Sequence, residues 1–113
     1  MHEMSLMQGV LEIIEDASKN GGFAKVRKVR LEIGALSGVD PRALDFCFDA
    51  VMQGSLARDA VLEIIMLPGE GWCMKCSKTV LISERFDPCP ICGGYQIQVT
   101  GGGEMRVKEL EVE

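Results

Sequence analysis

Two closely spaced cysteine pairs constrain this chain more than any other feature of its sequence. Cys73 and Cys76 form the first pair, Cys89 and Cys92 form the second, and twelve residues separate the pairs. This spacing is close to that of four-thiolate zinc sites, in which two intervening residues let both sulfurs of a pair face one ion. The surrounding segment of about 36 residues has few aromatic side chains and could not bury enough apolar surface to fold without such an ion. We therefore predict a structural zinc site, closed by four thiolates.

The cysteines allow other interpretations, which carry less weight. Iron could occupy the same four sulfurs, as in rubredoxin-like knuckles, but an electron carrier rarely needs a second domain larger than its cluster domain. The fifth cysteine, Cys47, lies between Phe46 and Phe48 on the apolar face of a predicted helix, and we expect it in the core. An odd number of cysteines, an acidic N-terminus unlike a secretory leader and the lack of a long apolar run favour reduced thiols in a cytoplasmic protein.

Hydrophobic periodicity predicts two helices and three strands outside the cysteine segment. Apolar residues recur at helical spacing over 5–20, and again after Asp40-Pro41, a strong helix start, until about Gly54. Alternating apolar and charged residues around 29–33, branched residues over 61–67 and the tail over 105–112 predict strands. A phase change in the tail between Val107 and Leu110 suggests a bulge, and we expect the tail to pair with the earlier strands.

These elements predict an α+β fold, in which two helices pack on a small three-stranded sheet and a zinc-ribbon-like module is inserted. The predicted domains are an α+β domain formed by residues 1–67 plus 104–113 and a zinc-binding domain formed by residues 68–103.

The charge balance bears on two rival functions, nucleic-acid binding and catalysis. Twelve basic and seventeen acidic residues give a formal net charge of −5, and the cysteine segment itself has equal numbers of both. A nucleic-acid-binding zinc ribbon is therefore the weaker alternative, because no basic stripe follows the cysteines. The one basic cluster, over 25–30, is better interpreted as the solvated face of a strand. No phosphate loop or nucleophile motif indicates an enzyme, and we expect none.

The only histidine of the chain is residue 2. Next to a free amine, an imidazole, the terminal nitrogen and deprotonated amides can surround one Ni(II) or Cu(II) ion. Because His2 is large, Met1 should be retained and the amine should keep its position. Glu3 could add an oxygen or a backbone nitrogen. The alternatives are an incidental His2 and a solvated Glu3, and the residues alone leave them open.

The chain resembles a known family in its N-terminal Met1-His2-Glu3, in its helix with the sequence Leu44–Asp49 and in its cysteine pairs. Over essentially all 113 residues it is similar to the HypA family of hydrogenase nickel-incorporation proteins. The resemblance implies a nickel metallochaperone that is not an enzyme. It also implies that the chain works with a HypB-like GTPase and delivers nickel for maturation of the large subunit of [NiFe]-hydrogenase, without a nucleic-acid or membrane partner. A homodimer is left open.

The resemblance also implies roles for individual residues. His2 would bind the cargo Ni(II) through its imidazole, Met1 and Glu3 would complete that site, and zinc would be held by Cys73, Cys76, Cys89 and Cys92. Some family members carry histidines beside the cysteine pairs, but here Ser77-Lys78 and Gly93-Gly94 follow them, so the resemblance does not extend to exchange of cysteine for histidine ligands. Asp40 could offer a further carboxylate, but a helix-cap role already accounts for it.

Overall fold

The computed structural model describes residues 3–113, and these form two compact units. The first unit contains the chain up to Leu31 together with Val39–Ile64 and Val107–Glu113. The second contains Glu32–Gly38 and Ile65–Arg106. The predicted site residues Met1 and His2 lie outside the described residues. The domain boundaries at 67/68 and 103/104 stay a prediction, and the second unit includes a segment, 32–38, that the sequence did not assign to it.

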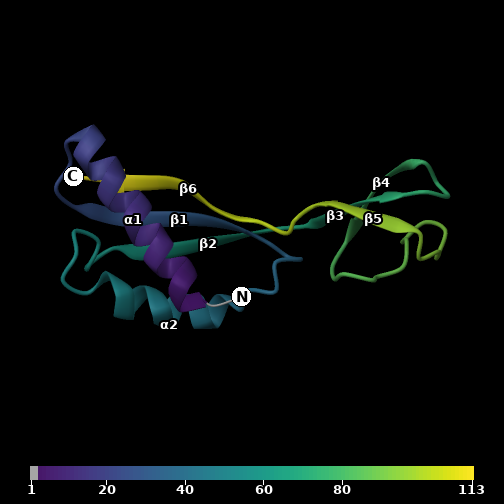
Figure 1. Cartoon of the computed structure of the whole chain (residues 1–113), viewed down its shortest axis with the longest axis horizontal. Helices are drawn as coiled ribbons and strands as arrows, with labels where there is room; N and C mark the ends of the chain where they lie inside the picture. The colour runs from purple at the N-terminus through teal and green to yellow at the C-terminus, as the bar shows by residue number, and fades with distance from the viewer. Residues whose placement is uncertain (1–2) are drawn as a thin grey trace. The chain divides into compact units, whose positions relative to one another are not determined.

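Two helices belong to the first unit, as predicted (Figure 1). α1 spans Glu3–Gly21 and α2 spans Pro41–Met52. Asp40 caps α2, since its carboxylate accepts a hydrogen bond from the backbone N–H of Arg42 at 2.9 Å and satisfies an otherwise free donor of the first turn. The helices contact each other and bury their apolar faces, formed by Met7, Val10, Ile14, Leu44, Cys47, Phe48 and Met52. Cys47 is therefore a core residue, which confirms its prediction.

One three-stranded sheet contains the strands that the sequence predicted. β1 spans Val26–Gly34, β2 spans Val61–Leu67 and β6 spans Met105–Val112, in the order β2-β1-β6. Val29, Leu31 and Ile33 of β1 are buried, as their alternation predicts. The C-terminal tail pairs with β1, so the α+β fold class and the place of the tail are confirmed.

Ion pairs cover the polar face of this sheet in the first unit. Arg30 lies 2.9 Å from Glu109, 2.8 Å from Glu111 and 3.4 Å from Glu63. Lys28 lies 3.5 Å from Glu63. The basic cluster that could have suggested a nucleic-acid surface thus contacts carboxylates on both neighbouring strands, and these carboxylates offset its charge.

A second three-stranded sheet belongs to the second unit. β3 spans Gly69–Cys73, β4 spans Lys78–Ile82 and β5 spans Ile97–Gly101, in the order β4-β3-β5. Both pairings are antiparallel, and Trp72 lies opposite Thr79 on one side and Gln98 on the other. The sequence did not predict these strands, because runs of five residues interrupted by glycine and cysteine show little apolar alternation.

The segment that follows β1 is part of the second unit. The backbone N–H groups of Gly34, Ala35 and Leu36 donate to the carbonyls of Glu104, Leu67 and Gly102, each at 2.8 Å. Gly34 approaches the carbonyl of Gly102 so closely that no Cβ would fit between them. This segment therefore holds together the strands that lead into and out of the cysteine module. None of the described helices is both long and apolar enough to span a membrane.

Candidate metal centre

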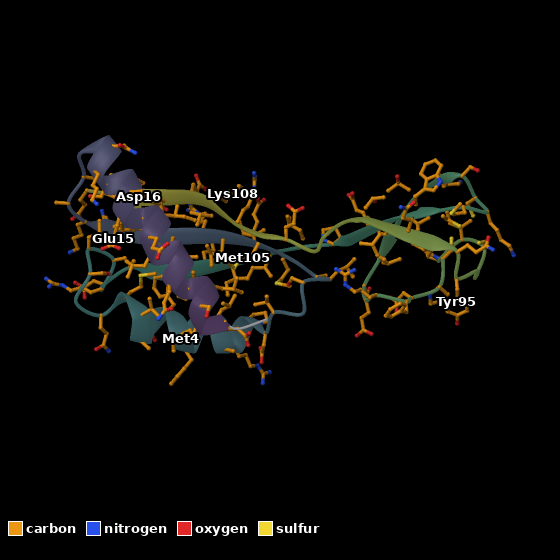
Figure 2. All side chains as sticks on the ribbon, viewed as in Figure 1. Met4, Glu15, Asp16, Tyr95, Met105 and Lys108 are labelled. Carbon is orange, nitrogen blue, oxygen red and sulfur yellow. The ribbon has the colours of Figure 1, made fainter. Side chains whose placement is uncertain are left out.

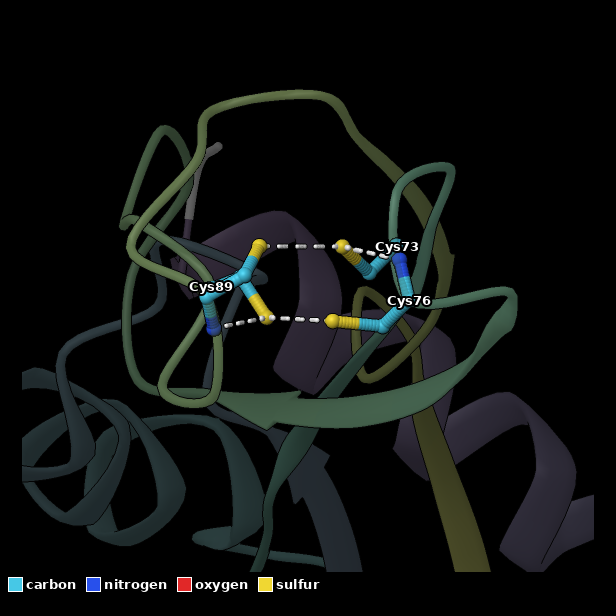
Figure 3. A group of neighbouring side chains, drawn as sticks. Cys73, Cys76 and Cys89 are labelled. Atoms are coloured by element: carbon cyan, nitrogen blue, oxygen red, sulfur yellow. Dashed lines mark hydrogen bonds between the residues drawn. The ribbon is translucent and has the colours of Figure 1, made fainter.

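The four paired cysteines meet at one point of the second unit. Cys73 is the last residue of β3, Cys76 lies in the turn that leads to β4, and Cys89 and Cys92 lie in the loop between β4 and β5. Their sulfur atoms all lie within 4.8 Å of one another. Figure 3 shows Cys73 and Cys76 facing Cys89 across a small gap. The predicted ligands are thus brought together as one group that could hold a metal ion.

The spacing of the sulfurs fits a tetrahedral ion. Cys73 Sγ lies 3.7 Å from Cys92 Sγ, and Cys76 Sγ lies 3.9 Å from Cys89 Sγ. A tetrahedron with metal–sulfur bonds of about 2.3 Å has edges of about 3.8 Å. A disulfide would need about 2.05 Å, and all four cysteines are free. The donor set is therefore four thiolates at the separation that zinc or iron requires, with no position left for a substrate.

The two halves of the centre have the same backbone geometry. Ser77 donates its N–H to the carbonyl of Cys73, and Gly93 donates to that of Cys89, each at 2.8 Å. Both Ser77 and Gly93 have positive φ, of 53° and 73°. Each knuckle therefore turns back through a left-handed residue directly after its second cysteine, and only the second knuckle has the glycine that adopts this conformation without strain.

Replacing Ser77 with glycine should stabilise the second unit. The left-handed conformation costs a residue with a Cβ on the order of 1 kcal/mol relative to glycine, and the Ser77 side chain is exposed. We expect the zinc-loaded S77G protein to gain about 1 kcal/mol in the free energy of unfolding, measured with denaturant. A loss of stability would show that the serine hydroxyl matters more than the strain.

Backbone donors surround the sulfur of Cys89. The N–H groups of Ile91 and Cys92 lie 3.4 Å and 3.5 Å from its Sγ. In the metal-free protein, the hydrogen bond from the Cys92 N–H favours the thiolate of Cys89 most strongly, and the hydrogen bond from the Ile91 N–H adds to this effect. Together they outweigh the opposing effect of burial and lower the pKa of the Cys89 thiol to about 6. Burial, together with hydrogen bonds to the other three sulfurs, raises the pKa of the Cys76 thiol to about 12. At neutral pH Cys89 is therefore already a thiolate that can bind an ion, whereas the Cys76 thiol must first lose its proton.

This difference predicts how metal affinity depends on pH. The ion must displace the Cys76 proton at every pH below about 12, so affinity should fall as pH falls. Below about pH 6 the Cys89 thiol also takes up a proton in the metal-free protein, so the decline should steepen by about one further proton per ion. Competition titrations with a chromophoric zinc chelator between pH 5 and 8 measure this slope. A slope that does not change through pH 6 would contradict the role given to Cys89.

The predicted N-terminal site is described only in part. Glu3 is the first residue of α1 and is partly buried. Met1 and His2 lie outside the described residues, so the nickel site stays a prediction. Asp40, which the sequence analysis left out of that site, acts as the cap of α2.

Sequence reasoning missed two residues that support the cysteine centre. Leu36 is 5% exposed and packs in one cluster with Cys73 and Cys89. The Arg85 side chain donates its Nε–H to the carbonyl of Leu36 at 3.3 Å. Leu36 stands in a turn far from the cysteines in sequence, and no local pattern could have assigned it to them.

Comparison with known proteins identifies similar sequences along the whole chain. Residues 1–112 match the family model described as hydrogenase/urease nickel incorporation, metallochaperone, HypA. The chain is 65% identical to the hydrogenase maturation factor HypA of Albidiferax ferrireducens and 59% identical to that of Rhodopseudomonas palustris, with all of both chains covered. The solution structure of the Ni metallochaperone HypA from Helicobacter pylori superposes with a TM-score of 0.72 at 28% identity, covering 99% of this chain and 97% of that one.

Proposed function

The chain belongs to the HypA family of nickel-incorporation metallochaperones, and from this premise we propose that it binds Ni(II) at Met1, His2 and Glu3 for hydrogenase maturation. A GTPase partner takes part in delivery to the [NiFe]-hydrogenase large subunit. Zinc on the four cysteines holds the second unit together. The chain itself catalyses no reaction in this scheme.

The observation that carries the nickel proposal is the position of the only imidazole in the chain. His2 directly precedes Glu3, the first residue of α1, and the family match includes both. An imidazole and neighbouring backbone nitrogens form the nitrogen-rich donor set that Ni(II) favours. The carboxylate of Glu3 adds an oxygen donor within the same tripeptide. A site built from consecutive residues can be stripped of its ion one ligand at a time, as a delivery protein requires.

The four-cysteine centre supports a different role for zinc. Its sulfurs are spaced for a tetrahedral ion and leave no open coordination position, which is typical of structural zinc. Cys73, Cys76, Cys89 and Cys92 would all bind it as thiolates. The zinc supplies folding free energy to a unit with few buried apolar side chains. Cargo and structural metal are thus assigned to different donor sets, nitrogen and oxygen for nickel and sulfur for zinc.

In this proposal, the GTPase partner supplies the energy for nickel delivery by hydrolysing a nucleotide. The sequence has no phosphate-binding loop, so any nucleotide hydrolysis must come from another protein. We expect purified protein to form a complex with the HypB-type GTPase of the same organism, measured by size-exclusion chromatography with light scattering. Parallel pull-downs from hydrogenase-producing cells should recover the same GTPase. Recovery of ribosomal or DNA-bound complexes without that GTPase would instead favour the nucleic-acid-binding alternative.

A further inference from the structure

The four cysteines of the candidate metal centre differ in how well the fold protects them. Cys73 and Cys89 are buried, Cys76 is partly buried, and Cys92 is exposed. Tyr95, three residues further along the chain, is 74% exposed and lies at the surface of the second unit (Figure 2), so this large side chain does not bury Cys92 either. Cys92 is therefore the cysteine of the centre that a small molecule in solution reaches most easily.

A glycine keeps the space beside the Cys92 sulfur open. A Cβ built on Gly94 would lie 3.4 Å from Cys92 Sγ and 3.5 Å from the Cδ of Lys75. Apart from the chain neighbours of Gly94, no other heavy atom lies within 4 Å of that position. The φ of Gly94 lies outside the left-handed region, so the backbone does not demand a glycine here. What the glycine provides is free space next to the sulfur.

The side chain of Lys75 borders the same space. Its Cδ is two bonds from the ammonium nitrogen, so the positive charge stays close to this side of the centre. Among residues 3–113, no carboxylate lies within ion-pair distance of Lys75. An uncompensated cation beside an exposed sulfur stabilises negative charge that develops there during a reaction.

Backbone hydrogen bonds also distinguish the sulfurs. The N–H of Cys76 donates to Cys73 Sγ at 3.4 Å, and two backbone N–H groups donate to Cys89 Sγ. In the part of the chain that the structure describes, no backbone N–H donates to Cys92 Sγ. Because a hydrogen bond stabilises the charge of a thiolate, it makes the sulfur a weaker nucleophile. Cys92 thus combines exposure with a sulfur whose reactivity no backbone donor reduces.

We propose that Cys92 is a peroxide-sensitive residue whose oxidation, followed by a disulfide with Cys73, releases the metal of the second unit, and this rests on the proposed zinc centre. The Cys92 thiolate attacks one oxygen of hydrogen peroxide, the O–O bond breaks, hydroxide leaves, and the sulfur becomes a sulfenic acid. The Cys73 thiolate, whose Sγ lies 3.7 Å away, then attacks this sulfur. The S–S bond forms, and the S–O bond breaks with loss of a second hydroxide. In total, two thiolates give up two electrons and one peroxide is reduced to two hydroxide ions.

The disulfide leaves the centre with only two of its four thiolates, those of Cys76 and Cys89. Two thiolates cannot complete a tetrahedral site, so the chain no longer holds the ion tightly. Because the metal supplies folding free energy to the second unit, oxidation should also loosen that unit, while the first unit keeps its own core. A reducing dithiol restores both thiolates by exchange, so the change is reversible.

The experiment follows zinc release from the reduced, zinc-loaded, full-length chain after addition of hydrogen peroxide, with a chromophoric zinc chelator as the indicator. Peroxide should release the zinc, and mass spectrometry of the digested protein should find a first disulfide between Cys73 and Cys92. Dimedone, which traps sulfenic acids, should label Cys92 when it is added together with the peroxide. Dithiothreitol with added Zn(II) should then restore the original zinc content, and failure to restore it would contradict the reversible step.

Two variants test the residues beside Cys92 without altering a cysteine. Gly94→Ala places a methyl group next to the sulfur and should slow peroxide-dependent release at least about threefold, because the attack depends on access. Lys75→Met removes the cation that stabilises the departing hydroxide and should slow release about threefold. Without peroxide, both variants should lose zinc to the chelator as slowly as the unaltered chain. If one variant fails this condition, the other decides.

Matched controls make the same changes in the first unit. Gly9→Ala adds a methyl group to α1 at a position with no heavy atom within 4 Å of the new Cβ. Lys108→Met removes a lysine from β6. Both controls should release zinc in peroxide at the rate of the unaltered chain, because neither touches the surroundings of Cys92.

The possible failures can be told apart. Purified chain that contains no zinc would overturn the zinc centre and this proposal with it. Zinc-loaded chain that keeps its zinc in peroxide would overturn only the proposed oxidation, as would equal rates of release in Gly94→Ala, Lys75→Met and the unaltered chain. A sulfenic acid on another cysteine, or a first disulfide between any other two cysteines, would overturn the assignment to Cys92 and Cys73.

Discussion

Replacing His2 with alanine should abolish binding of Ni(II) to the N-terminal site. The imidazole is the only one in the chain, so no other residue can replace this donor. Zinc content and thermal unfolding should stay nearly unchanged, because the four cysteines are untouched and His2 precedes α1. Calorimetric titration of untagged, zinc-loaded protein with Ni(II) measures the loss. In the unaltered protein, binding should weaken as pH falls through about 6.5, where protons compete for the imidazole.

A one-residue extension ahead of Met1 provides a second test of the same site. It keeps the sequence of the tripeptide but moves the terminal amine away from the imidazole, so nickel affinity should fall although no side chain has changed. Glu3→Gln removes only the carboxylate and should weaken binding less than the loss of His2. Identical nickel titrations for the unaltered, extended and His2→Ala proteins would show that the N-terminal assignment is wrong.

Replacing Cys89 with serine should remove zinc and unfold the second unit. Structural zinc contributes on the order of 10–16 kcal/mol in small zinc-finger peptides, far more than the apolar contacts of this unit can replace. We expect the C89S protein to lose its zinc to a chelator that leaves the unaltered protein loaded. The helices of the first unit should remain, because their core does not include Cys73, Cys76, Cys89 or Cys92. Circular dichroism and metal analysis measure both outcomes.

The structure extends this prediction to a residue distant from the cysteines in sequence. Leu36 packs with Cys73 and Cys89, and its N–H donates to the carbonyl of Gly102. Hydrogen exchange at the Leu36 amide should therefore accelerate in the C89S protein, whereas the amides of α1 should stay protected. Cys47→Ala is the matched control, since Cys47 lies in the core of the first unit and should leave one zinc per chain. Protection of Leu36 without zinc would show that this segment is ordered independently of the metal.

Much of the first unit follows from local sequence patterns. The helix start at Asp40-Pro41 was predictable because capping depends on groups only two residues apart, and Asp40 indeed accepts from Arg42. β2 spans Val61–Leu67, as its run of branched residues predicts. The periodicity of α2 also separates buried Phe48 from exposed Phe46. These features depend on neighbouring residues, whose spacing can be read directly from the chain.

The four-cysteine centre was predictable for a related reason. Two residues between paired cysteines suffice to turn both sulfurs toward one point, and the four sulfurs do converge within 4.8 Å. The spacing says nothing of the difference between the pKa values of Cys76 and Cys89. That difference depends on which backbone N–H groups point at each sulfur and on how deeply each lies in the folded unit.

Only the tertiary structure decided the contacts between residues far apart in sequence. The sequence predicts that Lys28 and Arg30 lie on the solvated face of a strand, but only the fold shows that Glu63 and Glu111 lie beside them. No sequence pattern assigned Leu36 to the cysteine module, but in the folded chain its N–H donates to the carbonyl of Gly102 and its side chain packs with Cys73 and Cys89. The sequence alone determined the helices, the strands of the first sheet and the grouping of the four paired cysteines, because periodicity and cysteine spacing act over a few residues. Burial and ion pairing depend on which distant segments meet, and that is settled only when the chain folds.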